Sequence, residues 1–125
     1  MPASCSYSVD NNILYCMVEG VVTIDDFKQL MLEIVSSTEY PVDVKTLWDI
    51  RKLDLSSITR ELADQLISLR EKNPQRGATS IAIVAEENHG FGMSRMYEML
   101  SSQLPQQIMV FRDYKAGETW LMEQA

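Results

Sequence analysis

The only histidine of this sequence has a side chain that could take part in catalysis. His89 lies in the segment 86–92, next to two glutamates. A catalytic histidine needs an orienting acid and a nucleophile within reach, and no motif places a nucleophile beside it. We therefore favour a solvated loop histidine over a hydrolase that uses Cys16 or Ser57. One histidine and two cysteines without ligand spacing do not make a metal site, so we predict no catalytic residue, metal or cofactor.

A carboxylate and a guanidinium follow one another at the end of a predicted strand. Asp49 ends an apolar run, and Arg51 lies two residues further on. A carboxylate beyond the carboxyl end of a strand can belong to a binding site. It can equally hold backbone amides of the next loop. We favour the structural role for Asp49, because no second carboxylate is placed by spacing to form an acid–base pair.

Two serines come just before the second predicted helix. Asp54, Ser56 and Ser57 each have the side chain of a helix N-cap. A phosphate on Ser56 or Ser57 would meet free backbone amides and a favourable helix dipole. Simple capping explains the same residues, and it is the interpretation that we favour.

A methionine-rich helix is predicted for residues 93–103, directly after Gly90 and Gly92. The two glycines complete neither phosphate-binding pattern, so we expect a flexible turn that lets this helix move. Methionine adapts to varied partners. The alternatives to core packing are therefore a pliable apolar groove or a surface that faces a membrane. The side chains that we place on the buried face or its flank are Met93, Met96, Tyr97, Leu100 and Met99.

Strands and helices alternate along the chain, which predicts a mainly parallel sheet within one domain, 1–125. The predicted order is β-β-α-β-α-β-α-β-α, an α/β fold with a five-stranded mixed sheet flanked by helices. The first two strands should form a hairpin through the turn 10–12. The strands are expected at 6–9, 13–18, 45–50, 79–85 and 107–111.

Helix boundaries and cysteines complete the local predictions. Thr23 and Asp26 are spaced as a capping box, and Asp113 can cap the last helix. Cys5 and Cys16 lie on the two strands of the predicted hairpin. We expect two packed, reduced thiols rather than a disulfide, because no export signal precedes them.

Composition excludes several classes of protein. The chain has 125 residues and a net charge of −7, with 18 acidic and 11 basic side chains. Such an acidic chain is a poor candidate for binding nucleic acid or anionic lipid. No apolar run approaches the ~20 residues of a membrane helix. We expect a cytoplasmic protein whose membrane contact, at most peripheral, uses an apolar face.

Several segments between Gly20 and Leu121 resemble the SpoIIAA-like, or STAS-like, small bacterial proteins. The resemblance implies a β/α superhelix without known catalytic residues. Some STAS relatives are anti-sigma-factor antagonists phosphorylated in a D-S-S-G motif; here the loop reads Asp-Leu-Ser-Ser-Ile, so only Ser56 or Ser57 carries over. Others resemble lipid-binding CRAL-TRIO domains. The segments are GVVTIDDF (20–27), LWDIR (47–51), FGMSRMY (91–97), VFRD (110–113) and WL (120–121).

We therefore expect a non-enzymatic regulatory module that binds a protein partner, as a homodimer. The alternative is a carrier of a small apolar ligand or lipid, which predicts an enclosed apolar cavity of ~300 Å³ or more beside the third helix. The candidate ligand or partner surface comprises Asp49, Arg51, His89, Phe91, Met93, Met96, Tyr97 and Met99.

Overall fold

A single five-stranded sheet forms the centre of the molecule in the computed structural model, which describes residues 3–124 except for the side chain of Leu55. The strands lie in the order β1-β2-β3-β4-β5, with β1 antiparallel to β2 and all other neighbours parallel. This confirms the predicted fold class and the initial hairpin. The strands are β1 (Ala3–Ser8), β2 (Ile13–Gly20), β3 (Lys45–Leu53), β4 (Ser80–Val84) and β5 (Gln107–Phe111).

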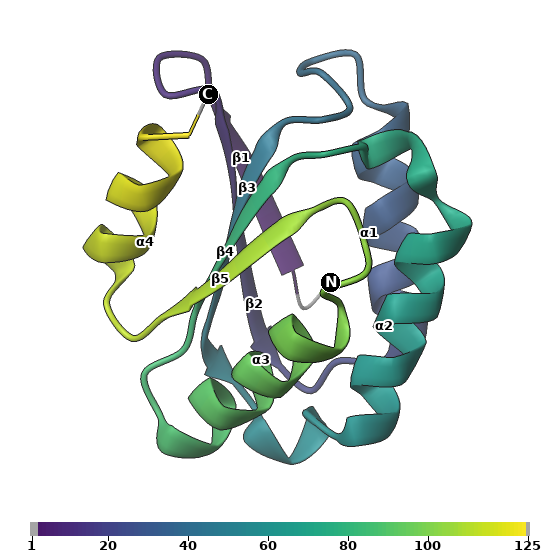
Figure 1. Cartoon of the computed structure of the whole chain (residues 1–125), viewed down its shortest axis with the longest axis vertical. Helices are drawn as coiled ribbons and strands as arrows, with labels where there is room; N and C mark the ends of the chain where they lie inside the picture. The colour runs from purple at the N-terminus through teal and green to yellow at the C-terminus, as the bar shows by residue number, and fades with distance from the viewer. Residues whose placement is uncertain (1–2, 125) are drawn as a thin grey trace.

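The helices cover the two faces of the sheet unequally. The three helices that connect parallel strands lie together on one face, and the last helix covers the other (Figure 1). With every crossover on one face, the strands follow one another across the sheet in chain order, which is the superhelical arrangement. The helices are α1 (Ile24–Ser36), α2 (Arg60–Lys72), α3 (Asn88–Leu100) and α4 (Tyr114–Met122).

Successive side chains of a strand point to opposite faces of the sheet. Apolar side chains therefore form one layer on each face. The smaller layer lies beneath α4, where Leu121 packs against Ile13, Leu47 and Val84 with no exposed surface on any of them. The larger layer lies beneath α1, α2 and α3, and includes Leu14, Cys16, Val18, Ile81, Ile83 and Val110. Trp48 packs against all three clusters of this larger layer.

The hairpin confirms one local prediction and corrects another. Asn12 in its turn takes a positive φ of 54°, the left-handed conformation that asparagine tolerates. Cys5 and Cys16 lie directly opposite one another on β1 and β2 and are joined by a disulfide. The expectation of two reduced thiols is wrong for this structure. That expectation depended only on a reducing cellular compartment. The register of β1 and β2 brings the two sulfur atoms together.

Two helices begin as the sequence predicts. Thr23 and Asp26 form the capping box of α1, with the Thr23 amide donating to Asp26 Oδ2 at 2.9 Å and the Asp26 amide donating to Thr23 Oγ1 at 3.4 Å. At the start of α4, the Ala116 amide donates to Asp113 Oδ2 at 2.9 Å. Both caps are local motifs, so their spacing in the sequence suffices to identify them.

The other two helices begin elsewhere than predicted. Thr59 caps α2, whereas Asp54 caps a separate 3₁₀ turn, Leu55–Ser57. Helix α3 begins at Asn88 and ends at Leu100, so the predicted flexible glycine turn is its first turn. The Phe91 amide already donates to the Glu87 carbonyl at 2.8 Å. Glycine can adopt the helical backbone as well as a flexible turn. Contacts from elsewhere in the chain favour the helix here.

Candidate functional site

Asp49 and Arg51 form an ion pair on the sheet face that α4 covers. Arg51 Nε and Nη2 donate to the two carboxylate oxygens of Asp49 at 2.8 Å each, and the Arg51 amide donates to Oδ1 at 3.1 Å. The Arg51 guanidinium also lies 5.0 Å from the ring centre of Tyr114. Burial raises the pKa of Asp49, but the hydrogen bonds from Arg51 outweigh it and leave that pKa below its ordinary value. Both carboxylate oxygens of Asp49 are therefore engaged by Arg51, and its structural role stays a prediction.

A tyrosine–glutamate contact on the same face escaped the sequence analysis. Tyr15 Oη donates to Glu118 Oε2 at 2.6 Å and accepts from Asn11 Nδ2 at 3.1 Å, and its ring stacks on Tyr114. Burial and the bond to Glu118 raise the pKa of Tyr15 to about 12. Tyr15 and Glu118 are 103 residues apart, so no local pattern could pair them.

Replacing Tyr15 with phenylalanine is expected to change how stability depends on alkaline pH. The unfolded phenol loses its proton near pH 10 and the folded phenol near 12. The stabilisation from Tyr15, about 1 kcal/mol for its hydrogen bond, is thus complete below pH 10 and declines as pH rises towards 12. Urea unfolding of wild type and Tyr15→Phe near pH 9 and pH 11 measures this, and the stability gap should narrow. A gap that is unchanged or wider at the higher pH would contradict the assignment.

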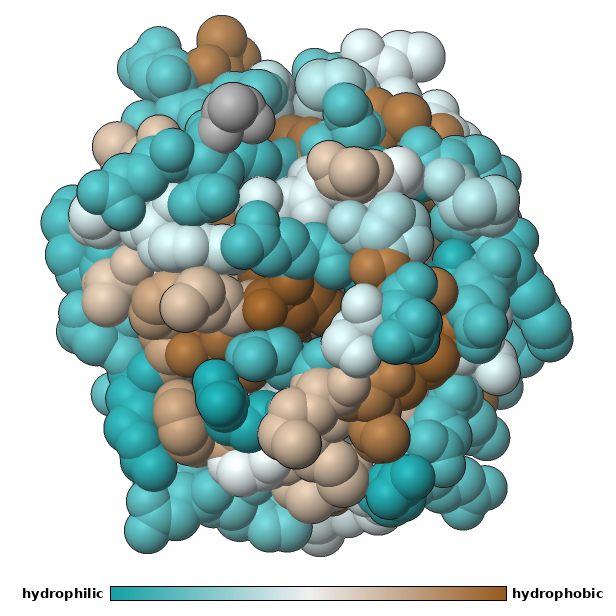
Figure 2. All heavy atoms as spheres, in the orientation of Figure 1, coloured by the Kyte–Doolittle hydropathy of each residue, from teal (hydrophilic) through white to brown (hydrophobic). Residues whose placement is uncertain are grey.

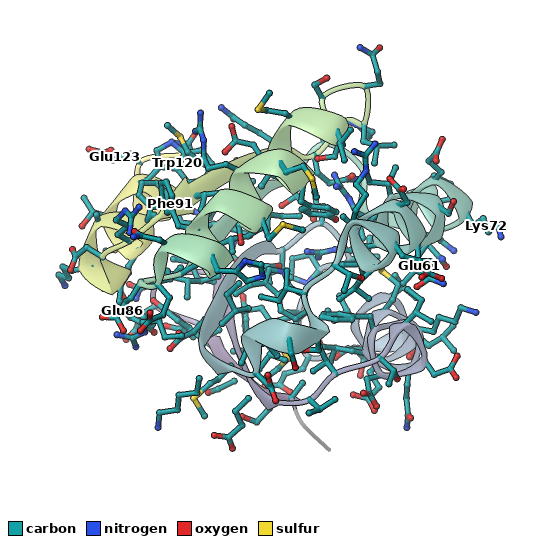
Figure 3. All side chains as sticks on the ribbon, turned by 90° about the horizontal axis from the view of Figure 1, so that it is seen from below. Glu61, Lys72, Glu86, Phe91, Trp120 and Glu123 are labelled. Carbon is teal, nitrogen blue, oxygen red and sulfur yellow. A yellow bond between two sulfur atoms is a disulfide. The ribbon has the colours of Figure 1, made fainter. Side chains whose placement is uncertain are left out.

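The beginning of α3 is anchored by an arginine from the end of β5. The Arg112 guanidinium lies 4.2 Å from the ring centre of Phe91 and donates at 3.0 Å both to the Glu86 carbonyl and to Asn88 Oδ1. Figure 3 shows Glu86 and Phe91 on the same side of the molecule. These contacts explain why 88–92 is helical and correct the prediction of a hinge there. Phe91 serves this anchor and does not line the cavity described below.

The two side chains considered as nucleophiles, Cys16 and Ser57, are bound to groups other than His89. The sulfur of Cys16 is bonded to Cys5, and the Ser57 hydroxyl donates to the Asp54 carbonyl at 2.6 Å. His89 is exposed on the first turn of α3, and within residues 3–124 the structure records no hydrogen bond from it to either group. The geometry gives the hydrolase interpretation no support.

Ser56 and Ser57 do not lie where a phosphate would meet the amides of α2. The Ser56 hydroxyl donates to Asp54 Oδ1 at 2.7 Å, and both serines belong to the 3₁₀ turn before the helix. The amide of Leu62 in the first turn of α2 donates to Thr59 Oγ1. The predicted helix-terminus site is therefore wrong in its placement, while modification of either serine stays a prediction.

An apolar cavity lies between the sheet and the three helices α1, α2 and α3 that cover one of its faces. It measures about 150 Å³, half of what the carrier interpretation predicts, and its wall is mainly apolar. Figure 2 shows apolar atoms gathered in the middle of the face where Figure 1 places α2, α3 and β5. The apolar lining includes Phe27, Met31, Ile34, Trp48, Ile50, Leu53, Ile58, Leu62, Ala63, Leu66, Leu69, Ile81, Ile83, Met93 and Ile108.

The predicted methionine-rich surface is divided in the structure. Met93 and Tyr97 line the cavity, Met96 is half-buried outside its lining, and Met99 is 68% exposed. The third helix therefore contributes one wall of the cavity rather than a continuous surface of methionines. The other walls come from β3, β4, α1 and α2, which sequence periodicity identified only as core.

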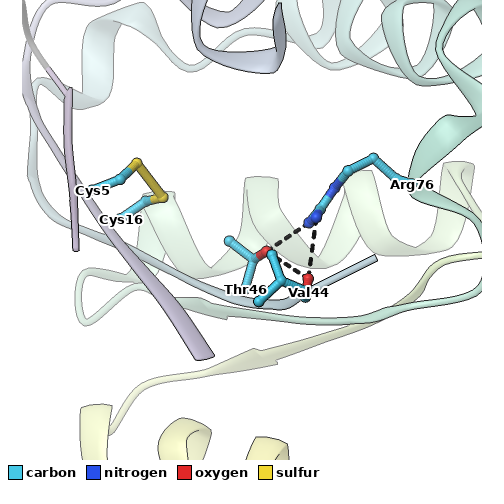
Figure 4. Close-up of a disulfide and its surroundings, with 5 residues drawn as sticks. All are labelled: Cys5, Cys16, Val44, Thr46 and Arg76. Atoms are coloured by element: carbon cyan, nitrogen blue, oxygen red, sulfur yellow. Dashed lines mark hydrogen bonds between the residues drawn. A yellow bond between two sulfur atoms is a disulfide. The ribbon is translucent and has the colours of Figure 1, made fainter. Parts of the chain in front are cut away.

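Two buried arginines also line this cavity, and the sequence analysis missed both. Arg76 donates to the carbonyl of Val42 at 2.8 Å. It also donates to the carbonyl of Val44 at 3.1 Å and to Thr46 Oγ1 at 2.6 Å (Figure 4). Burial lowers the pKa of Arg76 to about 10. A signal existed for Arg70, because it follows the buried face of α2 at a spacing of four from Leu62 and Leu66.

No group of three or more histidine, cysteine, aspartate or glutamate side chains comes together as a metal site in the part of the chain that the structure describes. Among the same residues, no helix combines the length and the hydropathy needed to cross a bilayer. The outer side of α2 is charged, with Glu61 and Lys72 pointing away from the sheet (Figure 3).

Comparisons with known proteins support the fold. No protein-family model matches the chain, and no curated protein matches it. A solved structure does: an uncharacterised protein of the DUF3478 family with a SpoIIAA-like fold, from Shewanella loihica PV-4. Its TM-score is 0.63 at 18% identity, over 95% of this chain and 91% of that one. The chain therefore has a SpoIIAA-like fold, in agreement with the resemblance seen in the sequence.

Proposed function

We propose that this protein is a non-catalytic regulatory module that responds to a small apolar ligand held in the cavity beneath α2 and α3. The observation that carries this proposal is the cavity itself, about 150 Å³ in volume and lined mainly by apolar side chains. Protein interiors are close-packed and contain few voids larger than a water molecule. A small apolar ligand bound there would remove apolar surface from water, which favours binding.

The size of the cavity limits which ligands it can hold. A dry apolar cavity of about 150 Å³ engineered into another protein takes up benzene or xenon. The cavity here therefore suits one small ring or a short chain, and it is too small for a long-chain lipid. This favours a sensor of a small molecule over the lipid carrier that was the alternative to a regulatory module.

Tryptophan fluorescence offers a direct test with benzene as the probe. Trp48 lines the cavity, whereas Trp120 packs in the layer beneath α4. In a Trp120→Phe background, saturable quenching or a shift of the remaining emission is expected when benzene binds. The absence of any saturable change would argue against the proposed function.

A matched pair of substitutions locates the binding. Ala63 lines the cavity on α2 and is 7% exposed, while Ala116 is exposed on α4 on the opposite face. Ala63→Leu should fill part of the cavity and weaken benzene binding by tenfold or more, about 1.4 kcal/mol. Ala116→Leu should leave it unchanged. Equal affinities in the two variants would place the binding elsewhere and overturn the assignment.

The expected homodimer stays a prediction. In the sheet that the structure describes, β5 pairs with β4 on one side and ends the strand order on the other. An edge strand presents unpaired backbone groups that another chain can pair with, and Met109 on this strand is 41% exposed. Native mass spectrometry of the purified protein reports the oligomeric state and any retained small molecule together.

A further inference from the structure

Arg70 is a buried cation whose five N–H groups are only partly used. Its side chain lines the cavity, and the residue is only 8% exposed. Nη1 donates to Tyr97 Oη and Nη2 to Gln106 Oε1, each at 2.9 Å, while the buried Nε has no partner among the described residues. Gln106 is itself oriented by a bond from Nε2 to the Gly77 carbonyl at 2.7 Å. The guanidinium is therefore held in place with an N–H unpaired.

The charge of Arg70 is not balanced within the site. Neither Arg70 nor Arg76 takes part in an ion pair in the described part of the chain, although the whole protein carries a net charge of −7. Burial raises the pKa of Tyr97, although Arg70 opposes this, so the phenol stays neutral. The partners of Arg76 are also neutral oxygens. Buried charges are ordinarily paired with an opposite charge, and an anionic ligand beside Arg70 would supply one.

We infer that the ligand of this cavity is a small amphipathic carboxylate, with its charged group on Arg70 and its apolar part against Trp48, Leu66 and Met93. This inference rests on the proposed function and names the class of molecule bound. Guanidinium suits a carboxylate because its planar N–H groups match the two oxygens. The cavity of about 150 Å³ limits the apolar part to a short chain or a single ring.

The wild-type protein tests the inference with two probes of equal chain length. Hexanoate and 1-hexanol offer the same apolar chain, but only hexanoate carries a charge at neutral pH. We expect hexanoate to bind roughly ten- to a hundredfold more tightly than 1-hexanol, as for a charge-assisted hydrogen bond in a buried site. Isothermal titration calorimetry of the wild-type protein supplies both dissociation constants.

Substitution of Arg70 provides the second part of this binding experiment. Arg70→Met should abolish the preference for hexanoate while 1-hexanol still binds. Arg60→Met, which removes an exposed arginine at the start of the same helix, should keep the preference. The comparison of probes on the wild type needs no variant, so it decides the matter even if Arg70→Met does not fold.

The outcomes separate the two proposals. Tighter binding of hexanoate that depends on Arg70 supports both. Equal affinity for hexanoate and 1-hexanol keeps the ligand cavity but overturns the carboxylate. Failure of benzene, hexanoate and 1-hexanol alike overturns the proposed function itself.

Discussion

Replacing Arg76 with methionine is expected to lower the free energy of unfolding by about 3 kcal/mol. Arg76 is 5% exposed and its guanidinium joins the turn before β4 to the segment that enters β3. Methionine would leave the Val42 carbonyl and Thr46 Oγ1 without that donor, at roughly 1–3 kcal/mol for each buried group. Removing a desolvated charge offsets part of this cost. Urea denaturation near neutral pH measures the difference.

Two variants control for charge and for side-chain length at Arg76. Arg76→Lys keeps the positive charge, but one ammonium cannot reproduce the planar fork, so an intermediate loss is expected. Arg60→Met removes an arginine whose side chain is 61% exposed, and its effect should stay within about 0.5 kcal/mol. If Arg76→Met were as mild as Arg60→Met, the three hydrogen bonds of Arg76 would not contribute measurably to stability.

Truncating Leu121 to alanine is expected to cost roughly 3–4 kcal/mol, within the range for fully buried leucines. Leu121 has no exposed surface and packs against Ile13, Leu47 and Val84. Helix α4 has only nine residues, too few to be stable alone in water. It therefore depends on this contact to stay on the sheet. Chemical denaturation gives the overall loss, and hydrogen exchange in α4 shows whether the helix detaches first.

The neighbouring residue provides the matched control for Leu121. Met122 is 52% exposed on the same helix, so Met122→Ala removes a comparable side chain without opening a core cavity. Its effect should stay within about 0.5 kcal/mol. A similar loss in both variants would mean that α4 is stabilised by something other than the packing of Leu121.

The architecture explains why the candidate site is a cavity and not a crevice at the sheet edge. Open α/β sheets bind ligands beyond the carboxyl ends of the strands, where the strand order reverses. Here the order β1-β2-β3-β4-β5 contains no reversal. Near the carboxyl ends of β3 and β5, Arg51 and Arg112 instead each lie over an aromatic ring. The available space lies between the sheet face and the helices.

Local patterns determined the elements and their order. Alternation and apolar runs predicted five strands, and the periodicity of Leu62 and Leu66 predicted α2, because each pattern depends on residues a few positions apart. The Thr23–Asp26 box and the Asp113 cap followed for the same reason. The order of strands and helices then restricts the topology to few choices. The fold was therefore accessible from the sequence.

Long-range packing decided the site. The Cys5–Cys16 bond depends on strand register, the helical start of α3 on Arg112 from β5, and the setting of Arg70 on Tyr97 and Gln106. A cavity is the space left when whole helices settle on a sheet, and no sequence period encodes its volume. The sequence alone determined the elements and the apolar stripes along them. Only the tertiary structure decided that two buried arginines face the same apolar space, because burial of a charge depends on every neighbour at once.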